Sequence, residues 1–467
     1  MDLAHIWSPQ QAAIFDWFID GEGNLVVRAR AGTGKTTTIL EGITRAPEQN
    51  MLLCAFNKRI EQELSSRLKG NNAQAKTLHA LGYAVVRSVW NVRVVDRANQ
   101  RGLDLAIQVC GRSAPDLIIK MVAALHTKAR EMVPHAVDPG ELRDIAIQFD
   151  LDPTELSESA AGFKAFDLDY VLGRAVEAME LAATEKPGGG IDYADMLFLP
   201  VRNRWMRPTY DMVVVDEAQD MTATQLELAL GMVQKGGRVA IVGDDRQAIY
   251  GFRGADSGSI DRLKAELNAI ELPLTTTYRC GSAIVAEAQE LVPDFDCPPD
   301  SPAGRVSTLE SWEQLVQAAQ PDDFILSRKN APLAKVAMMF VRARRRIRIE
   351  GKDIGQGLKN LILRMEAGSI DDLVWKLAAW EEKEVARFTK LDLEEHAANV
   401  ADTVATVYTL MEGVFGIAEL LARIDELFSD YGKDMVVASS IHKAKGLEAD
   451  KVFILANTLY AKFSKDK

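Results

Sequence analysis

Cysteine, long apolar runs and excess positive charge are all scarce in this chain of 467 residues. The four cysteines lie far apart without CxxC spacing, so disulfide frameworks, zinc sites and iron–sulfur clusters have no support. No apolar stretch approaches the length of a membrane span, and residues 1–9 lack the charged-then-apolar pattern of an export signal. These absences predict a soluble protein of the reducing cytoplasm, with no membrane partner.

The charge balance is acidic, with a formal net charge of −12. This excludes a globally basic nucleic-acid binder, so any contact with DNA must come from a local groove. The composition, 47% hydrophobic and 26% charged, is ordinary for globular proteins. No internal repeat or low-complexity tract is evident, and the length predicts two to four domains.

A glycine-punctuated loop, ARAGTGKT at residues 29–36, follows a short apolar run at 24–27 and precedes a helical pattern at 36–43. This order of strand, loop and helix is the context that a phosphate-binding loop requires. Ala29 stands where the usual pattern has its first glycine. The context nevertheless favours a nucleotide site over a chance match.

The chemistry of this loop follows from its residue types. Gly32 and Gly34 let backbone NH groups turn toward a β-phosphate. Lys35 reaches the β and γ oxygens, and Thr36 offers its hydroxyl to a magnesium ion. The remaining loop residues that we assign to nucleotide binding are Ala31, Thr33 and Thr37.

A second motif, VVVDEAQD at residues 213–220, begins in an apolar run that predicts a buried parallel strand over 212–215. That strand delivers Asp216 and Glu217 at its carboxyl end, where α/β sheets place ligands. Asp216 is predicted to hold magnesium, and Glu217 to orient and deprotonate the attacking water. The two motifs together predict a nucleotide-hydrolysing enzyme.

The rest of the chain alternates α/β blocks with helical stretches. Further strands are expected at 51–55, 238–242, 324–326, 435–439 and 451–455. Apolar residues at three- and four-residue steps predict helices over 104–109, 117–126 and 170–183, and again between about 359 and 431.

Six motifs in order resemble the superfamily 1 DNA helicases of the UvrD/Rep type. Besides the two above, they are WSPQQ at 7–11, GDDRQAIYGFRGAD at 243–256, TTTYR at 275–279 and SIHKAKGLE at 440–448. The last string, and the QD ending of DEAQD, are similar to the 3′ to 5′ branch of that family.

The resemblance implies nucleotide contacts at five further residues. Gln11 would read the adenine edge, and Gln247 would sense the γ-phosphate. Tyr278 would stack on adenine, Arg279 would act on the γ-phosphate as an arginine finger, and Glu448 would lie near the ribose. With Lys35 and Glu217, we assign Gln247 and Arg279 to catalysis.

The resemblance also implies contacts with single-stranded DNA. Aromatic side chains stack on any base, so such contact tolerates different sequences. Phe252 stands where the family commonly has Trp. Phe56 is displaced by one residue from the usual stacking aromatic, and a place in the core is its alternative interpretation. The implied DNA-contacting residues are Phe56, Asn57, Thr77, His79, Tyr250, Phe252, Arg253 and His442.

The fold class implied by the resemblance is α/β, with two RecA-like parallel-sheet core domains and two mainly helical inserted subdomains. The first core would comprise 1–83 and 191–270, interrupted by a helical insertion at 84–190. The second core would comprise 271–358 and 432–467, interrupted by a short helical insertion at 359–431.

Three weaker features of the sequence do not indicate a specific function. The basic run at 342–348 is interpreted either as a phosphate contact or as a solvated helix face. The acidic turn at 192–195 receives no chemistry. The histidines outside the motifs show no ligand spacing and are interpreted as structural: His5, His126, His135 and His396.

Family members continue past the fifth motif into a sixth that supplies another arginine finger. The last arginine here is Arg423, before the fifth motif. We therefore expect either truncation, an arginine from a partner, or a degenerate motor, with truncation favoured. A missing finger costs about 10³ to 10⁵ in rate.

The function predicted from these features is an ATP-dependent helicase that uses ATP and Mg²⁺, moves 3′ to 5′ on single-stranded DNA and unwinds duplexes at single-strand/duplex junctions. The alternative is a non-motor module that binds ATP and DNA but turns over poorly. The pathway, whether repair, replication, recombination or phage metabolism, stays open.

Overall fold

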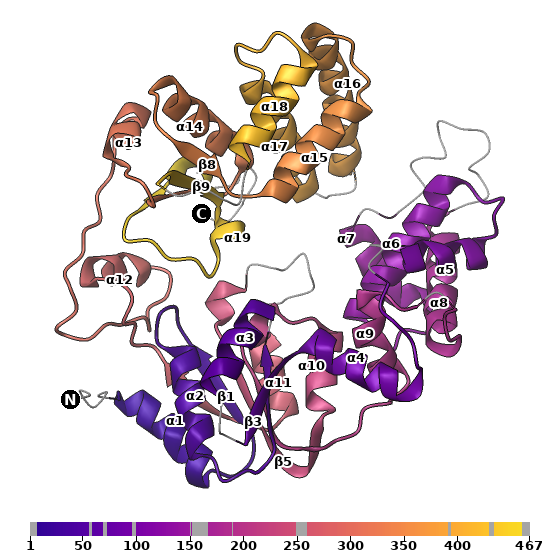
Figure 1. Cartoon of the computed structure of the whole chain (residues 1–467), viewed down its shortest axis with the longest axis vertical. Coiled ribbons are helices and arrows are strands. Elements are labelled where there is room, and N and C mark those ends of the chain that lie inside the picture. Colours follow the sequence, from indigo (N-terminus) through magenta and orange to yellow (C-terminus); the bar gives the residue numbers. More distant parts are fainter. Residues whose placement is uncertain are drawn as a thin grey trace. The chain divides into compact units, whose positions relative to one another are not determined.

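The computed structural model describes residues 7–55, 58–68, 72–95, 100–149, 151, 167–188, 190–248, 259–390, 394–428 and 434–459. The chain divides into two compact units, Met1–Val306 and Ser307–Lys467. Each unit contains a parallel β-sheet of its own (Figure 1).

A six-stranded parallel sheet with the order β3-β2-β4-β5-β1-β6 forms the centre of the first unit. Buried apolar runs make up β1 and β4, as a sheet that is covered on both faces requires. The loops after β1 and β4 leave the same edge of the sheet, because all its strands are parallel. The strands are β1 (Leu25–Ala29), β2 (Met51–Ala55), β3 (Ala73–Thr77), β4 (Tyr210–Val215), β5 (Val233–Gly243) and β6 (Ile270–Leu274).

Helices cover both faces of this sheet, and side chains alternate between the two cores along each strand. Along β1, Leu25 and Val27 join one core while Val26 joins the other. On the first face lie α1 (Pro9–Asp20), α2 (Lys35–Arg45) and α3 (Lys58–Arg67). On the second lie α4 (Leu78–Val89), α9 (Tyr193–Arg202), α10 (Ala223–Leu230) and α11 (Ser259–Glu266). Each fully buried aliphatic side chain contributes about 1.5–3 kcal/mol.

A helical insertion separates α4 from α9 in the sequence and has its own apolar core. Its longest helices, α6 and α8, pack their buried stripes on each other and on α5. The helices are α5 (Gln100–Cys110), α6 (Asp116–Met132), α7 (Arg143–Gln148), which follows the 3₁₀ turn η1 (Pro139–Leu142), and α8 (Leu168–Thr184).

Buried charges join this insertion to α9. The Arg130 side chain on α6 is fully buried, and its guanidinium pairs with Asp192 at 3.0 Å and with Asp195 at 2.5 Å. Arg101 on α5 also pairs with Asp195. Asp192 and Asp195 form the capping box that begins α9. The acidic turn at 192–195 is therefore a helix cap held by two arginines. Separating α9 from the insertion would leave these buried charges without partners, which is costly, so the ion pairs fix α9 against the insertion.

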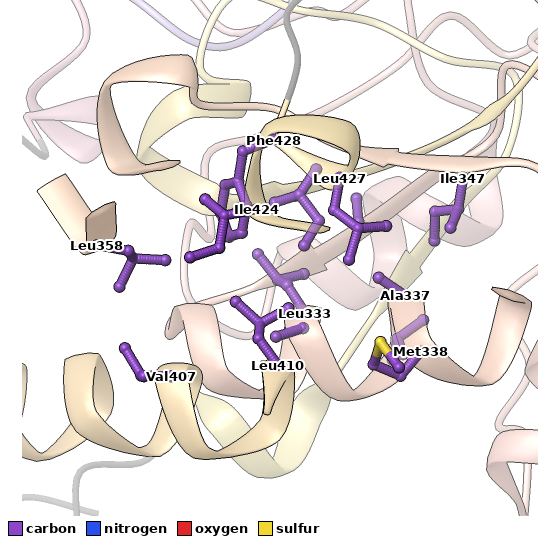
Figure 2. Packing of buried hydrophobic residues seen from close by; sticks show 14 of the residues in the cluster. Leu333, Ala337, Met338, Ile347, Leu358, Val407, Leu410, Ile424, Leu427 and Phe428 are labelled. Atoms are coloured by element: carbon purple, nitrogen blue, oxygen red, sulfur yellow. The ribbon is translucent and has the colours of Figure 1, made fainter. Parts of the chain in front are cut away.

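The second unit is built on a four-stranded parallel sheet with the order β10-β7-β9-β8. Figure 2 shows its core, in which Leu333 of α14, Leu410 of α17 and Ile424 of α18 pack together. The strands are β7 (Phe324–Ser327), β8 (Ile347–Ile349), β9 (Val436–Ser440) and β10 (Val452–Ile454). The helices are α13 (Trp312–Ala318), α14 (Asn330–Arg342), α15 (Lys352–Arg364), α16 (Ile370–Lys390), α17 (Glu394–Leu410), α18 (Ile417–Leu427) and α19 (Ile441–Ala444).

The predicted fold class is confirmed: the chain is α/β, with two parallel sheets as two RecA-like domains have. The domain limits stay a prediction. The structure includes β6 and the segment to Val306 in the first compact unit, whereas the sequence pattern assigned residues from 271 onward to the second core. None of the helices in the described ranges combines the length and the apolar character needed to cross a membrane.

The basic run at 342–348 does not lie on one helix, so its interpretation as a solvated helix face is wrong. α14 ends at Arg342, Arg344 has a left-handed φ of 55°, and the chain then enters β8. The Arg345 guanidinium donates to the carbonyl oxygens of Val316 and Ala319, and it packs over the ring of Phe340. Arg345 is thus a structural clamp between α14 and α13.

Candidate functional site

The phosphate-binding loop runs from the end of β1 at Ala29 to the start of α2 at Lys35. Gly34 begins the helix in the left-handed conformation, with φ 77°. No side chain caps α2, so its first NH groups point into the loop and attract an anion. The Thr33 hydroxyl donates to the Arg30 carbonyl at 2.9 Å and fixes the loop from within.

Four predicted site residues meet beside this loop. The Lys35 ammonium lies 3.1 Å from a carboxylate oxygen of Glu217. The Thr36 hydroxyl lies 3.4 Å from a carboxylate oxygen of Asp216. The strands β1 and β4 bring these pairs together from positions 180 and 182 residues apart. Their catalytic roles remain predictions.

Burial perturbs the charges of this cluster. Burial, and then the neighbouring Glu217, raise the pKa of Asp216 to about 6. Burial alone would lower the pKa of Lys35, but attraction from Glu217, Asp216 and Asp244 outweighs it and raises that pKa. Carboxylates outnumber the cation, so the site carries a surplus of negative charge that suits a divalent metal.

The residues present fit magnesium as the ligand. A hydroxyl and a carboxylate are hard oxygen donors, which Mg²⁺ prefers, and it usually takes only one or two protein carboxylates beside phosphate and water. Within the described ranges, no group of three or more His, Cys, Asp or Glu side chains is arranged to hold a metal ion without such help. Thr36 and Asp216 therefore suit a metal that arrives with a nucleotide.

Glu217 adopts a left-handed backbone conformation with φ 51°. A non-glycine residue in this region costs free energy, and such strain is concentrated at functional sites. The residue precedes the 3₁₀ turn η3 (Ala218–Asp220), and the buried Gln219 on that turn donates its amide NH to Glu217 at 2.6 Å. Lys35 and Gln219 thus both hold the Glu217 carboxylate.

Gln247 is tied to the same region through Asp244. Gln247 lies on the turn η4 (Asp245–Gln247), and its amide donates to the Asp244 carboxylate at 2.7 Å. The backbone NH of Asp244 donates to the side-chain oxygen of Gln219 at 3.0 Å. A hydrogen-bonded path therefore joins Glu217 to Gln247, and the sequence motifs gave no sign of it.

The structure places Gln11 under the phosphate loop, where it is only 3% exposed. Its side-chain amide NH donates to Thr38 at 3.0 Å, and its oxygen accepts from the backbone of Ser8. Gln10 instead bonds twice to Thr275. The adenine contact predicted for Gln11 stays a prediction, and both ends of its amide already bond within the protein.

Tyr278 and Arg279 also lie against the phosphate loop, within the first unit. The backbone NH of Tyr278 donates to the Gly32 carbonyl at 2.9 Å. A β-carbon on Gly32, whose φ is 70°, would meet Arg279 at 2.5 Å and Thr277 at 2.6 Å. Only glycine permits this approach, which brings Arg279 beside the loop. Tyr278 as a whole residue is 53% exposed, and its predicted stacking on adenine stays a prediction.

Two of the predicted DNA-contacting residues begin α4. The Thr77 hydroxyl accepts from the backbone of Ala80 and caps the helix. The His79 ring meets the Tyr193 ring edge to face, with centroids 6.0 Å apart, and burial lowers the pKa of His79. Tyr193 is 55% exposed on the first turn of α9. Sequence reasoning missed Tyr193; its only signal was an aromatic residue inside the acidic turn.

The second unit holds two more of the predicted residues. His442 lies on α19, and both of its ring nitrogens approach the Arg328 guanidinium, at 2.7 and 3.0 Å. Glu448 is exposed on the loop after α19. Arg328, which follows β7, is a second residue that the motifs did not indicate. The remaining predicted DNA contacts lie outside the described residues: Phe56, Asn57, Tyr250, Phe252 and Arg253.

A glycine-rich loop at a helix start, with a lysine and a threonine facing two carboxylates that follow a buried parallel strand, defines a P-loop nucleotide-binding protein. The family described as the UvrD/REP helicase N-terminal domain matches residues 7–268. The chain belongs to the UvrD/REP helicase family, which confirms the resemblance drawn from its motifs.

Several curated proteins are similar to this chain at low identity. An F-box DNA helicase protein 1 from Schizosaccharomyces pombe is 24% identical over 94% of this chain and 51% of its own length. The ATP-dependent DNA helicase UvrD2 of Mycobacterium tuberculosis is 26% identical over 66% of this chain and 50% of its own length. A probable DNA helicase II homolog from Rickettsia conorii is 24% identical over 62% and 45%, respectively. The chain spans about half the length of these relatives.

Proposed function

We propose that this chain hydrolyses Mg²⁺–ATP and couples hydrolysis to 3′ to 5′ movement on single-stranded DNA in the cytoplasm, unwinding duplexes at single-strand/duplex junctions. The observation that carries the proposal is the meeting of Lys35 and Thr36 with Glu217 and Asp216 at the amino terminus of α2. Family membership and the names of the relatives support the same reaction.

In this proposal, the backbone NH groups of the loop and the Lys35 ammonium bind the phosphate oxygens of ATP. Thr36 and Asp216 would hold the magnesium ion, which would neutralise developing charge on the phosphates when bound. Glu217 accepts the proton of the attacking water. Lys35 and Gln219 orient the carboxylate of Glu217, because both contact it.

Arg279 and Gln247 complete the phosphate side of the proposed site. Arg279 lies beside Gly32, where a guanidinium stabilises charge on a transferring phosphoryl group. Gln247 is held by Asp244 and responds to the γ-phosphate. For DNA, the exposed Tyr193 ring and its neighbour His79 offer a stacking surface, and base stacking contributes about 1–3 kcal/mol per base.

The decisive experiment is steady-state ATP hydrolysis by the chain with and without single-stranded DNA, beside Lys35→Ala as the background control. We expect hydrolysis that DNA stimulates and that the variant lacks. A strand-displacement assay on duplexes with a 3′ or a 5′ overhang then tests polarity. Binding of ATP and DNA without stimulated hydrolysis would refute the motor and favour a binding module.

A further inference from the structure

Arg30, the second residue of the phosphate loop, contacts three carboxylates. Its guanidinium lies 3.2 Å from Asp244 and 2.8 Å from Asp245, and it donates to Asp294 at 2.9 and 3.0 Å. The Arg30 side chain is only 7% exposed, and Asp244 only 2%. One side chain of the loop therefore fastens the η4 turn and the segment that follows α12 (Ser282–Ala288).

The Asp244 carboxylate is where this contact reaches the candidate catalytic groups. One of its oxygens accepts from Arg30 and from the backbone of Arg246, and the other accepts from the Gln247 amide. Its own backbone NH donates to Gln219, which in turn donates to Glu217. A β-carbon on Gly243 would meet Gln219 at 2.7 Å, so this packing leaves little room for adjustment.

The charges around Arg30 favour a fixed geometry. Burial would lower the pKa of Arg30, but hydrogen bonds to Asp294 and Asp245 outweigh burial and raise it. Burial also acts against the charged form of Asp245, whose pKa is nevertheless lowered by its hydrogen bond to Arg30. A planar guanidinium that bridges several carboxylates has few alternative positions.

We propose that Arg30 is a positioning residue for ATP hydrolysis: it holds Asp244, which sets the side chain of Gln247 directly and that of Glu217 through Gln219. The inference rests on the proposed function for its catalytic consequence. Arg30 itself contacts carboxylates of the protein. Its loss should therefore displace the side chains of Gln247 and Glu217, and it should affect turnover more than binding of ATP. A displacement of about 1 Å costs up to about 10²-fold in rate.

The matched pair of variants is Arg30→Gln and Arg28→Gln. Arg28 is a neighbouring arginine on β1 that shares Asp245 with Arg30, but its other partners are Asp261 and Glu271, not Asp244 and Asp294. In DNA-free hydrolysis of Mg²⁺–ATP, we expect R30Q to lower kcat about 10- to 100-fold while KM stays within about threefold. We expect R28Q to stay within about twofold of wild type in both. Arg30→Lys should recover part of kcat, because it keeps the charge but not the bridging fork.

Equal kinetics of R30Q and R28Q would overturn the inference, as would a rise in KM without a fall in kcat. Should R30Q fail to fold, Asp294→Asn takes its place, because Asp294 is 48% exposed and its loss endangers folding less. We expect D294N to lower kcat about threefold to tenfold. A wild-type kcat in D294N would contradict the role of Arg30.

Hydrogen exchange separates this inference from the proposed function. In R30Q, the backbone amides of residues 243–248 should exchange at least about tenfold faster than in wild type and in R28Q. This readout needs no hydrolysis. A wild-type chain that hydrolyses no ATP would remove the proposed function, whereas unchanged exchange at 243–248 in R30Q would remove the positioning role.

Discussion

Protonation of His126 should govern how the helical insertion tolerates acid. His126 lies on α6 with no exposed surface, and its Nε2 is 2.9 Å from the Gly102 carbonyl. Burial, together with the positive charge of Arg130, lowers the pKa of His126 to about 3 from an ordinary value of 6.5. The folded insertion therefore keeps this imidazole neutral at pH values where the unfolded chain protonates it.

The sign and size of the effect follow from this difference. Between the two pKa values the unfolded state binds a proton that the folded state does not bind. The stabilisation is therefore complete above pH 6.5 and is lost as the pH falls toward 3. Relative to pH 7.5, His126 should cost about 0.8 kcal/mol of unfolding free energy at pH 6 and about 2 kcal/mol at pH 5.

The assay is urea unfolding at pH 7.5, 6 and 5 for wild type and His126→Gln. The glutamine keeps a donor for the Gly102 carbonyl but does not titrate. We expect the variant to be less stable at pH 7.5 but to lose about 2 kcal/mol less than wild type on going to pH 5. His135→Gln, which replaces a half-exposed imidazole, controls for the loss of one histidine. Parallel pH profiles of wild type and H126Q would refute the reasoning.

Three further predictions concern the site and its support. Glu217→Gln should bind a fluorescent ATP analogue within about threefold of wild type but lower turnover about 100-fold or more, since the amide cannot accept the proton; near-normal turnover would remove Glu217 from the role of base. Tyr193→Ala should weaken single-stranded DNA binding about 5- to 100-fold in a fluorescence-anisotropy titration, whereas Tyr193→Phe keeps the ring and should bind normally. Gly82→Ala places a β-carbon 2.0 Å from the Met196 carbonyl oxygen, between α4 and α9, and should lower the free energy of unfolding by about 1–3 kcal/mol. In the control Gly173→Ala the new β-carbon meets nothing within 4 Å, so the melting temperature should stay unchanged or rise slightly.

The phosphate loop and the Asp216–Glu217 pair could be predicted because their chemistry is local. A glycine with positive φ, a lysine and a hydroxyl must follow one another closely to surround a phosphate, so their spacing identifies them. The carboxylates follow a buried strand, and parallel strands end at one edge of a sheet. Adjacency in the chain therefore carried the prediction.

Arg30 and Tyr193 could not be predicted because their partners are remote. Arg30 and Asp294 are 264 residues apart, and an isolated arginine is most often on the surface. Likewise, the sequence pattern assigns residues from 271 onward to the second core, because the pairing of β6 with β1 is not visible in the sequence. Pro273 within β6 is a weak signal of an edge strand, which is where the structure places it.

The pairing of β1 has a consequence for co-translational folding. β1 lies between β5 and β6, whose residues begin at 233 and 270. A nascent chain that has emerged only as far as residue 232 offers β1 neither neighbour, although the helices from α5 to α9 are already complete. Domains generally fold as their residues emerge, and distant strand pairing is slow. The phosphate loop at the end of β1 is therefore synthesised before either neighbour of β1, and the sheet around it can close only after both strands have emerged.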